Sequence, residues 1–264
     1  MTRPIIHAAA LQFAVTMEPA SNAAAIERLL ANAPADTLAV APEGALSGYV
    51  NEAGFVSRID QAATAAAIER IAAVCAAKRI HLVAGACINE AGAWRNASVY
   101  FGPRGERLRY DKINLAQSER GVFAPGGALP VFDIAIANAT AKLGIQMCRE
   151  IRYPEQWRVL AAQGAEIIAY VNNAIGSAKG HALWRAHAIS RAAETQRFVI
   201  GANNAAPDQT CPTFIIAPSG DVLAEAPIGA EAAIFAPLTL NDVSNWVLSQ
   251  ARTDLVGVDL LTSG

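Results

Sequence analysis

Segments that favour strands and segments that favour helices alternate along the whole chain, and this alternation restricts the fold more than any other feature. Residues 5–13, 36–41 and 80–88 are short apolar runs, which are typical of buried strands. The Ala-rich stretches 18–32 and 62–78 lie between them and have the composition of helices. The pattern predicts an α/β arrangement in which helices cover a sheet.

The second half of the chain continues this alternation. Pro154 stands near the start of one predicted helix and Gly164 follows its end, an order that favours a helix between them. The expected strands are residues 131–137, 142–147, 166–171 and 198–202, and the expected helices are residues 154–163 and 182–196.

Two predicted hairpins stand far apart in the sequence. Residues 97–101 and 107–111 flank Gly-Pro-Arg-Gly-Glu, and residues 215–217 and 222–226 flank Pro-Ser-Gly-Asp. They suggest two sheets of related construction, although no fixed period recurs along the chain. No Pro/Ser-rich linker divides the chain, so we expect a single α/β domain over residues 1–264, with a tail from about residue 238 that is a candidate for a subunit interface.

The composition is that of a globular protein. Hydrophobic residues make up 53% of the chain and charged residues 17%, and the formal net charge is −2. No run of Lys or Arg occurs, so nucleic acid is not an expected partner. No stretch approaches the ~20 apolar residues of a membrane helix. His7 and Gln12 interrupt the apolar run near the N-terminus, which argues against a signal peptide. We expect a cytoplasmic protein without a membrane partner.

The cysteines and histidines do not form the patterns of disulfide or metal sites. The four cysteines include no C-x-x-C pair, so a disulfide framework is not expected. His181 and His187 are six residues apart and therefore do not share a helix face as an i, i+4 pair would. We predict neither a metal nor another cofactor.

Cys148 is the first candidate for chemistry, because it ends an apolar strand a few residues before a predicted helix. A nucleophile at such a turn is exposed at the sheet edge, with backbone N–H groups nearby that can hold an oxyanion. The alternative is an ordinary buried cysteine. That interpretation suits Cys75, on an apolar helix face, and Cys87, near the end of a strand, better.

Glu43 and Lys112 are weaker candidates when each is taken alone. Glu43 follows a strand and Pro42, and ligands of α/β sheets bind at such strand ends. An exposed loop carboxylate is the common alternative. Lys112 ends a hairpin strand, where a lysine is usually a solvated edge residue. Glu119 lies seven residues further on, in a loop that contains several glycines.

Together, the surroundings of these residues resemble the nitrilase superfamily of carbon–nitrogen hydrolases. Three blocks in the family's chain order carry the resemblance: Ala41-Pro42-Glu43 with Ser47-Gly48-Tyr49, Tyr110-Asp111-Lys112-Ile113-Asn114-Leu115 with Glu119, and Cys148-Arg149-Glu150-Ile151-Arg152-Tyr153-Pro154-Glu155. Arg191-Ala192 with Glu194 resembles a further family helix, so the resemblance runs to about Asn204.

The resemblance implies an α-β-β-α sandwich of two mixed sheets flanked by helices, assembled as a homodimer or a higher homo-oligomer. It also implies a cysteine-dependent hydrolase of non-peptide C–N bonds that needs no cofactor. Cys148 would attack the amide carbon and form a thioester while Glu43 acts as general base and acid. Lys112 and a backbone N–H after the cysteine would hold the oxyanion. Glu119 would orient Lys112 or the substrate.

The residues after the cysteine favour a small amide, cleaved to acid and ammonia. Nitrilases usually have Trp-Glu at this point, whereas this chain has Arg149-Glu150, closer to the amidase and carbamoylase branches. Residues 154–158 and 164–168 look similar to N-carbamoyl amino acid hydrolases, so an N-carbamoyl substrate is the alternative. A nitrilase, an acyltransferase and an inactive scaffold are less favoured, the last because the residues matching the catalytic set are all retained.

By the same resemblance, three residues are expected to contact the substrate: Tyr49, Arg149 and Asn173. Asn173 would lie at the mouth of the strand before it. Arg149 and Arg152 could bind a substrate carboxylate bidentately. The alternative for Arg152, which we favour, is a structural ion pair with Glu150 or Glu155.

Overall fold

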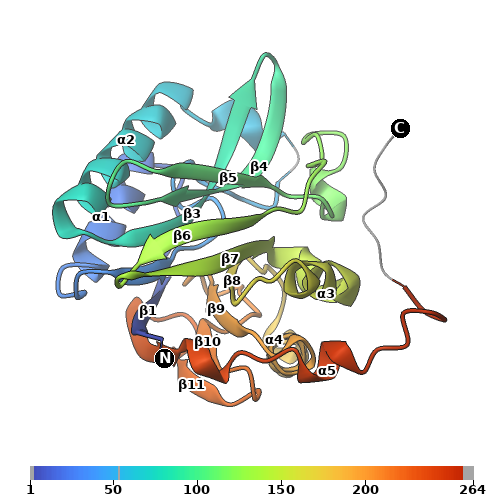
Figure 1. Ribbon diagram of the computed structural model, residues 1–264. Coiled ribbons are helices and arrows are strands. Elements are labelled where there is room, and N and C mark those ends of the chain that lie inside the picture. Colours follow the sequence, from blue (N-terminus) through green and yellow to red (C-terminus); the bar gives the residue numbers. More distant parts are fainter. Residues whose placement is uncertain (1–2, 53, 258–264) are drawn as a thin grey trace.

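The computed structural model describes residues 3–52 and 54–257, and these form two six-stranded β-sheets packed face to face (Figure 1). Helices α1 (Pro19–Leu29) and α2 (Gln61–Lys78) cover the outer face of one sheet. Helices α3 (Pro154–Ala162) and α4 (His181–Thr195) cover the other sheet. Each sheet thus buries both of its faces. This α-β-β-α sandwich confirms the expected fold class.

The spatial order of the strands differs from their order along the chain. The first sheet contains, from edge to edge, β12 (Ala232–Thr239), β1 (Ile5–Gln12), β2 (Thr37–Val40), β3 (His81–Glu90), β4 (Ala93–Phe101) and β5 (Arg107–Asp111). The second sheet contains β11 (Val222–Glu225), β10 (Phe214–Ile216), β9 (Phe198–Ala202), β8 (Ile167–Val171), β7 (Ala139–Met147) and β6 (Val131–Ile136).

The two sheets have the same pairing pattern. In the first, β1, β2 and β3 are parallel, flanked by antiparallel β12 on one side and by β4 and β5 on the other. In the second, β7, β8 and β9 are parallel, flanked by β6 and by β10 and β11. The related construction suggested by the two hairpins is therefore confirmed.

The parallel strands bring their carboxyl ends together between the sheets. Parallel strands that are connected through helices all end at the same edge of a sheet, where α/β proteins bind ligands. Glu43 follows β2, and its backbone N–H donates to the carbonyl of Asn172, which follows β8, at 2.9 Å. Cys148 follows β7 directly. The equivalent edges of the two sheets thus meet where the candidate residues lie.

The core follows the alternation of side chains along each strand. In β2, Leu38 and Val40 pack between the two sheets, whereas Ala39 faces the layer of α1 and α2. This is the period of two expected of a strand, with both faces buried because helices cover the outer one. It explains why the strands read as continuous apolar runs in the sequence.

The helix ends match their local sequence signals. Asp60 precedes α2 and accepts a hydrogen bond from the backbone N–H of Ala63 at 2.9 Å, which caps the helix. Pro154 is the first residue of α3, and Gly164, just beyond its end, has a φ of +93°, where glycine is unstrained.

Strand β12 is the main element that the sequence did not predict. Its run contains Pro237, and proline within an apolar run argues against a central strand. The structure places β12 at the edge of its sheet, where Pro237 pairs with His7. An edge strand tolerates proline, because one side of the strand needs no ladder hydrogen bonds.

The chain beyond β12 continues through α5 (Trp246–Ser249) and packs on the end of α4. The backbone N–H of Val247 donates to Gln196 Oε1 at 2.8 Å. Residues 258–264 of the tail considered as a subunit interface lie outside the described residues, and the homo-oligomer stays a prediction. Within the described ranges, no helix combines the length and the apolar character needed to cross a bilayer.

Candidate active site

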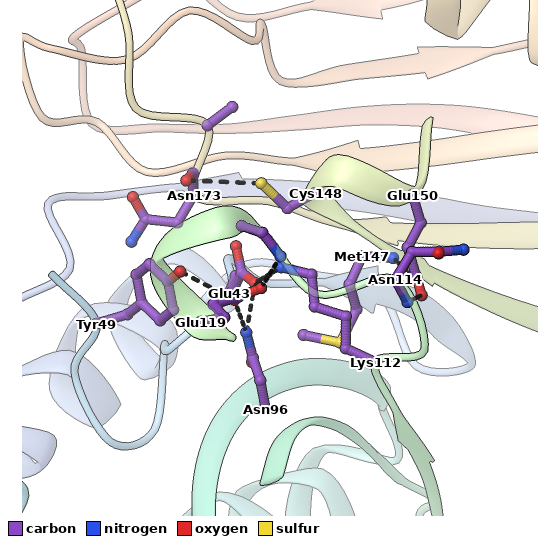
Figure 2. A network of polar contacts seen from close by, with 12 residues as sticks. Glu43, Tyr49, Asn96, Lys112, Asn114, Glu119, Met147, Cys148, Glu150 and Asn173 are labelled. Carbon is purple, nitrogen blue, oxygen red and sulfur yellow. Dashed lines mark hydrogen bonds and ion pairs between the residues drawn. The ribbon is translucent and has the colours of Figure 1, made fainter. Parts of the chain in front are cut away.

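Four polar side chains from separate segments form one buried cluster at the edge where β2 and β8 end (Figure 2). Lys112 Nζ donates to Oε1 of Glu43 and to Oε1 of Glu119, each at 2.8 Å. Asn96 Nδ2 donates to the same two oxygens, at 2.7 Å and 2.6 Å. All four side chains are excluded from solvent. The structure thus brings three of the sequence candidates together in one hydrogen-bonded group.

The backbone around each carboxylate fixes its position. Gly85 lies against the backbone of Glu43, since a Cβ at Gly85 would stand only 2.5 Å from the Cα of Glu43. Glu119 ends the 3₁₀ turn η2 (Gln117–Glu119), and its Oε2 accepts from the backbone N–H of Ala116. Both carboxylates are therefore held by their own segments as well as by the lysine.

Cys148 lies at the strand-to-turn junction expected from the sequence. It is the first residue of the 3₁₀ turn η3 (Cys148–Arg152) and has a φ of +38°, which is strained for a residue with a Cβ. Its Sγ lies 3.7 Å from the carbonyl oxygen of Asn173, and its own carbonyl accepts from Tyr170 Oη at 2.6 Å. Figure 2 shows the sulfur on the same side of the cluster as the Glu43 carboxylate and the Lys112 amine.

Burial and mutual charge set the ionisation of the cluster. Burial raises the pKa of Glu43, and the charge of Lys112 only partly offsets this. Burial also opposes ionisation of Glu119, but the charge of Lys112 and hydrogen bonds hold its pKa below the usual value. Burial lowers the pKa of Lys112, but the charges of the two carboxylates outweigh this and raise its pKa well above the usual value. Glu43 is therefore the carboxylate of the pair that more readily takes up a proton.

The Cys148 thiol interacts with the same charges. Burial raises its pKa, the Glu43 charge raises it further, and Lys112 lowers it. The resting thiol is therefore protonated at neutral pH, and a base must take its proton when it attacks. Glu43 Oε2 has no hydrogen-bond partner among the described residues, whereas Oε1 has two. The carboxylate thus keeps one oxygen free for that proton.

A pocket of about 490 Å³ opens above the cluster. It is lined by Tyr49, Asn51, Ala116, Gln117, Ser118, Cys148, Arg149, Arg152, Asn173, Ala174, Ile175 and Trp184. All three predicted substrate contacts are among these residues. Tyr49 is also tied to the cluster, since its Oη donates to Glu119 Oε1 at 2.9 Å. The residues that the structure describes contain no group of three His, Cys, Asp or Glu side chains arranged to hold a metal ion.

Sequence reasoning missed Asn96 and the role of Glu150. Asn96 lies in β4, directly before the residues predicted as a hairpin strand. The one sequence signal for a functional role was a polar residue beside apolar positions. Glu150 is fully buried, and its Oε1 accepts from Tyr110 Oη at 2.7 Å and from the backbone N–H of Ile113 at 2.8 Å. Its Oε2 accepts from the backbone N–H of Met147 at 2.8 Å. Glu150 thus joins the segment after Lys112 to the strand end before Cys148.

The ion pair favoured for Arg152 was wrong. Both carboxylate oxygens of Glu150 already accept hydrogen bonds from the donors just described. Within the described ranges, Arg152 forms an ion pair with neither Glu150 nor Glu155. Instead, the Arg152 guanidinium lies 5.5 Å from the ring centroid of Trp184, at cation–π distance. Burial explains the error, because a carboxylate that is fully enclosed and already hydrogen-bonded leaves no face for an exposed arginine.

A free thiol at a strand end, beside a buried carboxylate–lysine cluster in a two-sheet sandwich, is an arrangement that can support nucleophilic catalysis. Comparison with known proteins identifies the family. The model of the carbon–nitrogen hydrolase family matches residues 7–247. The chain belongs to the carbon–nitrogen hydrolase family, and the resemblance to the nitrilase superfamily is confirmed.

The individual relatives either have low sequence identity to this chain or match only part of it. An amidase of the nitrilase superfamily from Nesterenkonia has a similar fold, with a TM-score of 0.80 and 21% identity over 95% of each chain. A nitrilase from Pyrococcus abyssi is 34% identical over 97 residues, 36% of either chain. A 2-oxoglutaramate amidase from Paenarthrobacter nicotinovorans is 30% identical over 173 residues, 61% of this chain and 58% of the relative. The matched regions thus span less than two thirds of these two curated relatives.

Proposed function

We propose that this protein hydrolyses a small amide to a carboxylic acid and ammonia through a thioester on Cys148. The observation that carries the proposal is Glu43, which is fully buried, held by Lys112 and Asn96 through one oxygen, and unpaired among the described residues at the other oxygen, on the side of the thiol. Such a carboxylate is fixed in position and has a raised pKa, as a general base and acid requires.

In the first half-reaction, Glu43 takes the thiol proton as the sulfur attacks the amide carbon. Lys112 has three N–H donors and uses two on carboxylates, so one remains for the developing oxyanion. Arg149 is the second residue of η3, so its backbone N–H has no partner within the turn and supplies a second donor. The C–N bond then breaks, Glu43 gives its proton to the leaving nitrogen, and ammonia departs.

In the second half-reaction, Glu43 takes a proton from water, which attacks the thioester carbon. The C–S bond breaks, the thiolate recovers the proton from Glu43, and the acid is released. The amide preference is supported by the relatives named as amidases and by Arg149-Glu150 after the cysteine. An N-carbamoyl compound would react through the same steps.

The test is ammonia release from a panel of primary amides, N-carbamoyl amino acids and nitriles. We expect turnover of amides that disappears in Cys148→Ala, with nitriles the poorest group. Iodoacetamide should label Cys148 before Cys75, because Cys148 lines the pocket whereas Cys75 is enclosed. Turnover that persists in Cys148→Ala would contradict the mechanism. Hydroxamate formed with added hydroxylamine as the main product would instead indicate acyl transfer.

A further inference from the structure

The hydroxyl of Tyr170 ties strand β8 to the first peptide unit of the cysteine turn. Its Oη donates to the carbonyl of Cys148 at 2.6 Å. Burial raises the pKa of Tyr170 well above its usual value, so the hydroxyl keeps the proton that it donates. The Tyr170 side chain is fully buried in the core, whereas Cys148 and Arg149 line the pocket. The hydroxyl therefore holds the turn from the core side.

Two aromatic rings and a glycine fix the ring of Tyr170. The Trp157 ring packs edge-on against it, with 5.5 Å between the ring centroids, and the Phe214 ring stacks on it at 6.2 Å. Gly201 in β9 pairs with Tyr170, and a Cβ at Gly201 would stand 2.5 Å from Cε2 of Phe214. The glycine thus leaves the space that the Phe214 ring occupies. A side chain packed in this way holds its hydroxyl in one place.

The carbonyl that Tyr170 holds belongs to the same peptide unit as the backbone N–H of Arg149. This peptide bond is trans, so its C=O and N–H point in opposite directions. Because the carbonyl is directed toward the core, the Arg149 N–H is directed toward the pocket side. Cys148 has a φ of +38°, which a residue with a Cβ keeps only when its surroundings impose it. The hydrogen bond from Tyr170 is one of the contacts that impose it.

We propose that Tyr170 is a positioning residue, which aims the Arg149 backbone N–H at the oxyanion formed when Cys148 attacks. The role of this N–H as an oxyanion donor rests on the proposed function, whereas the Tyr170 contact is a feature of the fold. Oxyanion donors are effective when they are fixed in advance where the charge develops. Loss of the hydroxyl lets the peptide unit turn, which weakens the transition state more than the bound substrate.

Tyr170→Phe removes the hydroxyl and keeps the ring between Trp157 and Phe214. We expect kcat to fall about tenfold while KM changes by less than about twofold. The matched control is Tyr100→Phe in β4, which removes a similarly buried hydroxyl that lies 2.7 Å from His81 Nδ1. The control should lose comparable stability in urea denaturation and keep its kcat.

Two reactions of the Cys148 thiol test the inference without turnover. With butyraldehyde, a C–S bond forms, the thiol proton passes to Glu43, and the carbonyl oxygen becomes an oxyanion. With iodoacetamide, a C–S bond forms as iodide leaves, and no oxyanion develops. Tyr170→Phe should therefore weaken butyraldehyde binding about tenfold, measured by calorimetry, and leave the rate of Cys148 alkylation within about twofold of the wild type.

An unchanged kcat in Tyr170→Phe, or a loss of kcat that Tyr100→Phe shares, would overturn the inference, as would equal butyraldehyde binding by Tyr170→Phe and the wild type. Circular dichroism establishes that each variant folds. If Tyr170→Phe does not fold, Phe214→Leu keeps the hydroxyl but removes the stacked ring, and it should show the same pattern at smaller size. Absence of that pattern would also contradict the inference.

A failure of the proposed function would appear separately, as a wild-type protein that releases no ammonia from any amide. The comparison of butyraldehyde with iodoacetamide would still decide the role of Tyr170, because neither reaction requires hydrolysis.

Discussion

Lys112 Nζ donates to Glu43 Oε1 at 2.8 Å, and both side chains are completely enclosed by protein. The same nitrogen also donates to Glu119, so two buried carboxylates share one cation. Ions are costly to enclose, and such a group is stable only while each charge keeps its partner. Of the two carboxylates, Glu119 holds the negative charge more firmly, because Lys112 and hydrogen bonds lower its pKa despite burial, whereas burial raises the pKa of Glu43 and lets it take up a proton more readily.

Removal of the cation should therefore damage both stability and activity. Lys112→Met leaves two enclosed carboxylates without a counter-charge, and we expect a loss of about 3–5 kcal/mol in the free energy of unfolding. Activity should fall about 100-fold or more, because an oxyanion donor is lost. Urea denaturation and kcat measure the two effects. The control, Lys142→Met, breaks an exposed pair with Asp133 and should cost under about 1 kcal/mol.

A second substitution separates the two effects of Lys112. Lys112→Met combined with Glu119→Gln removes one of the unpaired charges, so the double variant should be more stable than Lys112→Met alone and still lack activity. A Lys112→Met protein as stable as the wild type would show that the ion pair is not formed as described.

Asn96 should tune the pKa of Glu43. Its amide donates to both carboxylates, and hydrogen bonds to a carboxylate favour the charged form. In Asn96→Ala, the pKa of Glu43 rises, and the acidic limb of kcat/KM moves to higher pH. The matched control is Ser98→Ala, two residues along the same strand, because Ser98 is equally buried and its hydroxyl has no partner among the described residues. Equal pH profiles for Asn96→Ala and the wild type would contradict this role.

The pH dependence of the wild type follows from the same shifts. Glu43 must be ionised to take the thiol proton, and burial raises its pKa, so kcat/KM should rise with pH through a midpoint above the ordinary value of 4.5. Burial alone would lower the pKa of Lys112, but the two carboxylates raise it above 10.5, so the oxyanion donor stays charged. The loss of the lysine proton should therefore cause no decline in kcat/KM between about pH 7 and about pH 9. A decline across that range would show that Lys112 loses its proton there.

The sequence predicted most of the fold because the strands are apolar runs bounded by clear turn and helix signals. The hairpin β4–β5 and the helix α3, which begins at Pro154, illustrate this. Strand β12 was not predicted because Pro237 argues against a central strand, although an edge strand tolerates proline. Its position at the edge depends on pairing with β1, which is more than 200 residues away in the sequence. Local sequence carries no information about such a partner.

For the candidate site, family resemblance identified the segments but not the hydrogen bonds between them. Glu43, Lys112 and Glu119 were singled out and lie in one cluster. Asn96 was missed because a single asparagine in a strand looks like an ordinary turn-flanking residue until the fold buries it. The ion pair assigned to Arg152 failed because sequence proximity to Glu150 says nothing about burial.

Glu150 should act as a positioning residue that links the Lys112 segment to the Cys148 turn. In Glu150→Gln, the new amide nitrogen would face donors such as the backbone N–H of Met147, so we expect a loss of about 1–3 kcal/mol in stability. The remaining folded enzyme should show a lower kcat with little change in KM, because the reacting groups lose alignment while the pocket persists. Urea denaturation and steady-state kinetics measure these effects.

The matched control for Glu150 is Glu155→Gln, an exposed glutamate at the start of α3. It should change neither stability nor kcat appreciably. If Glu150→Gln affected KM and left kcat intact, Glu150 would belong to substrate binding instead of positioning.

The most direct test of the central claim is mass spectrometry of the acyl-enzyme. The wild-type protein is mixed with the amide that gives the fastest ammonia release, quenched in acid during turnover, and digested. The proposed mechanism predicts a mass increase equal to the acyl group on the peptide that contains Cys148, and none in Cys148→Ala. Ammonia release without any adduct on Cys148, or with the adduct on Cys75, Cys87 or Cys211, would contradict it.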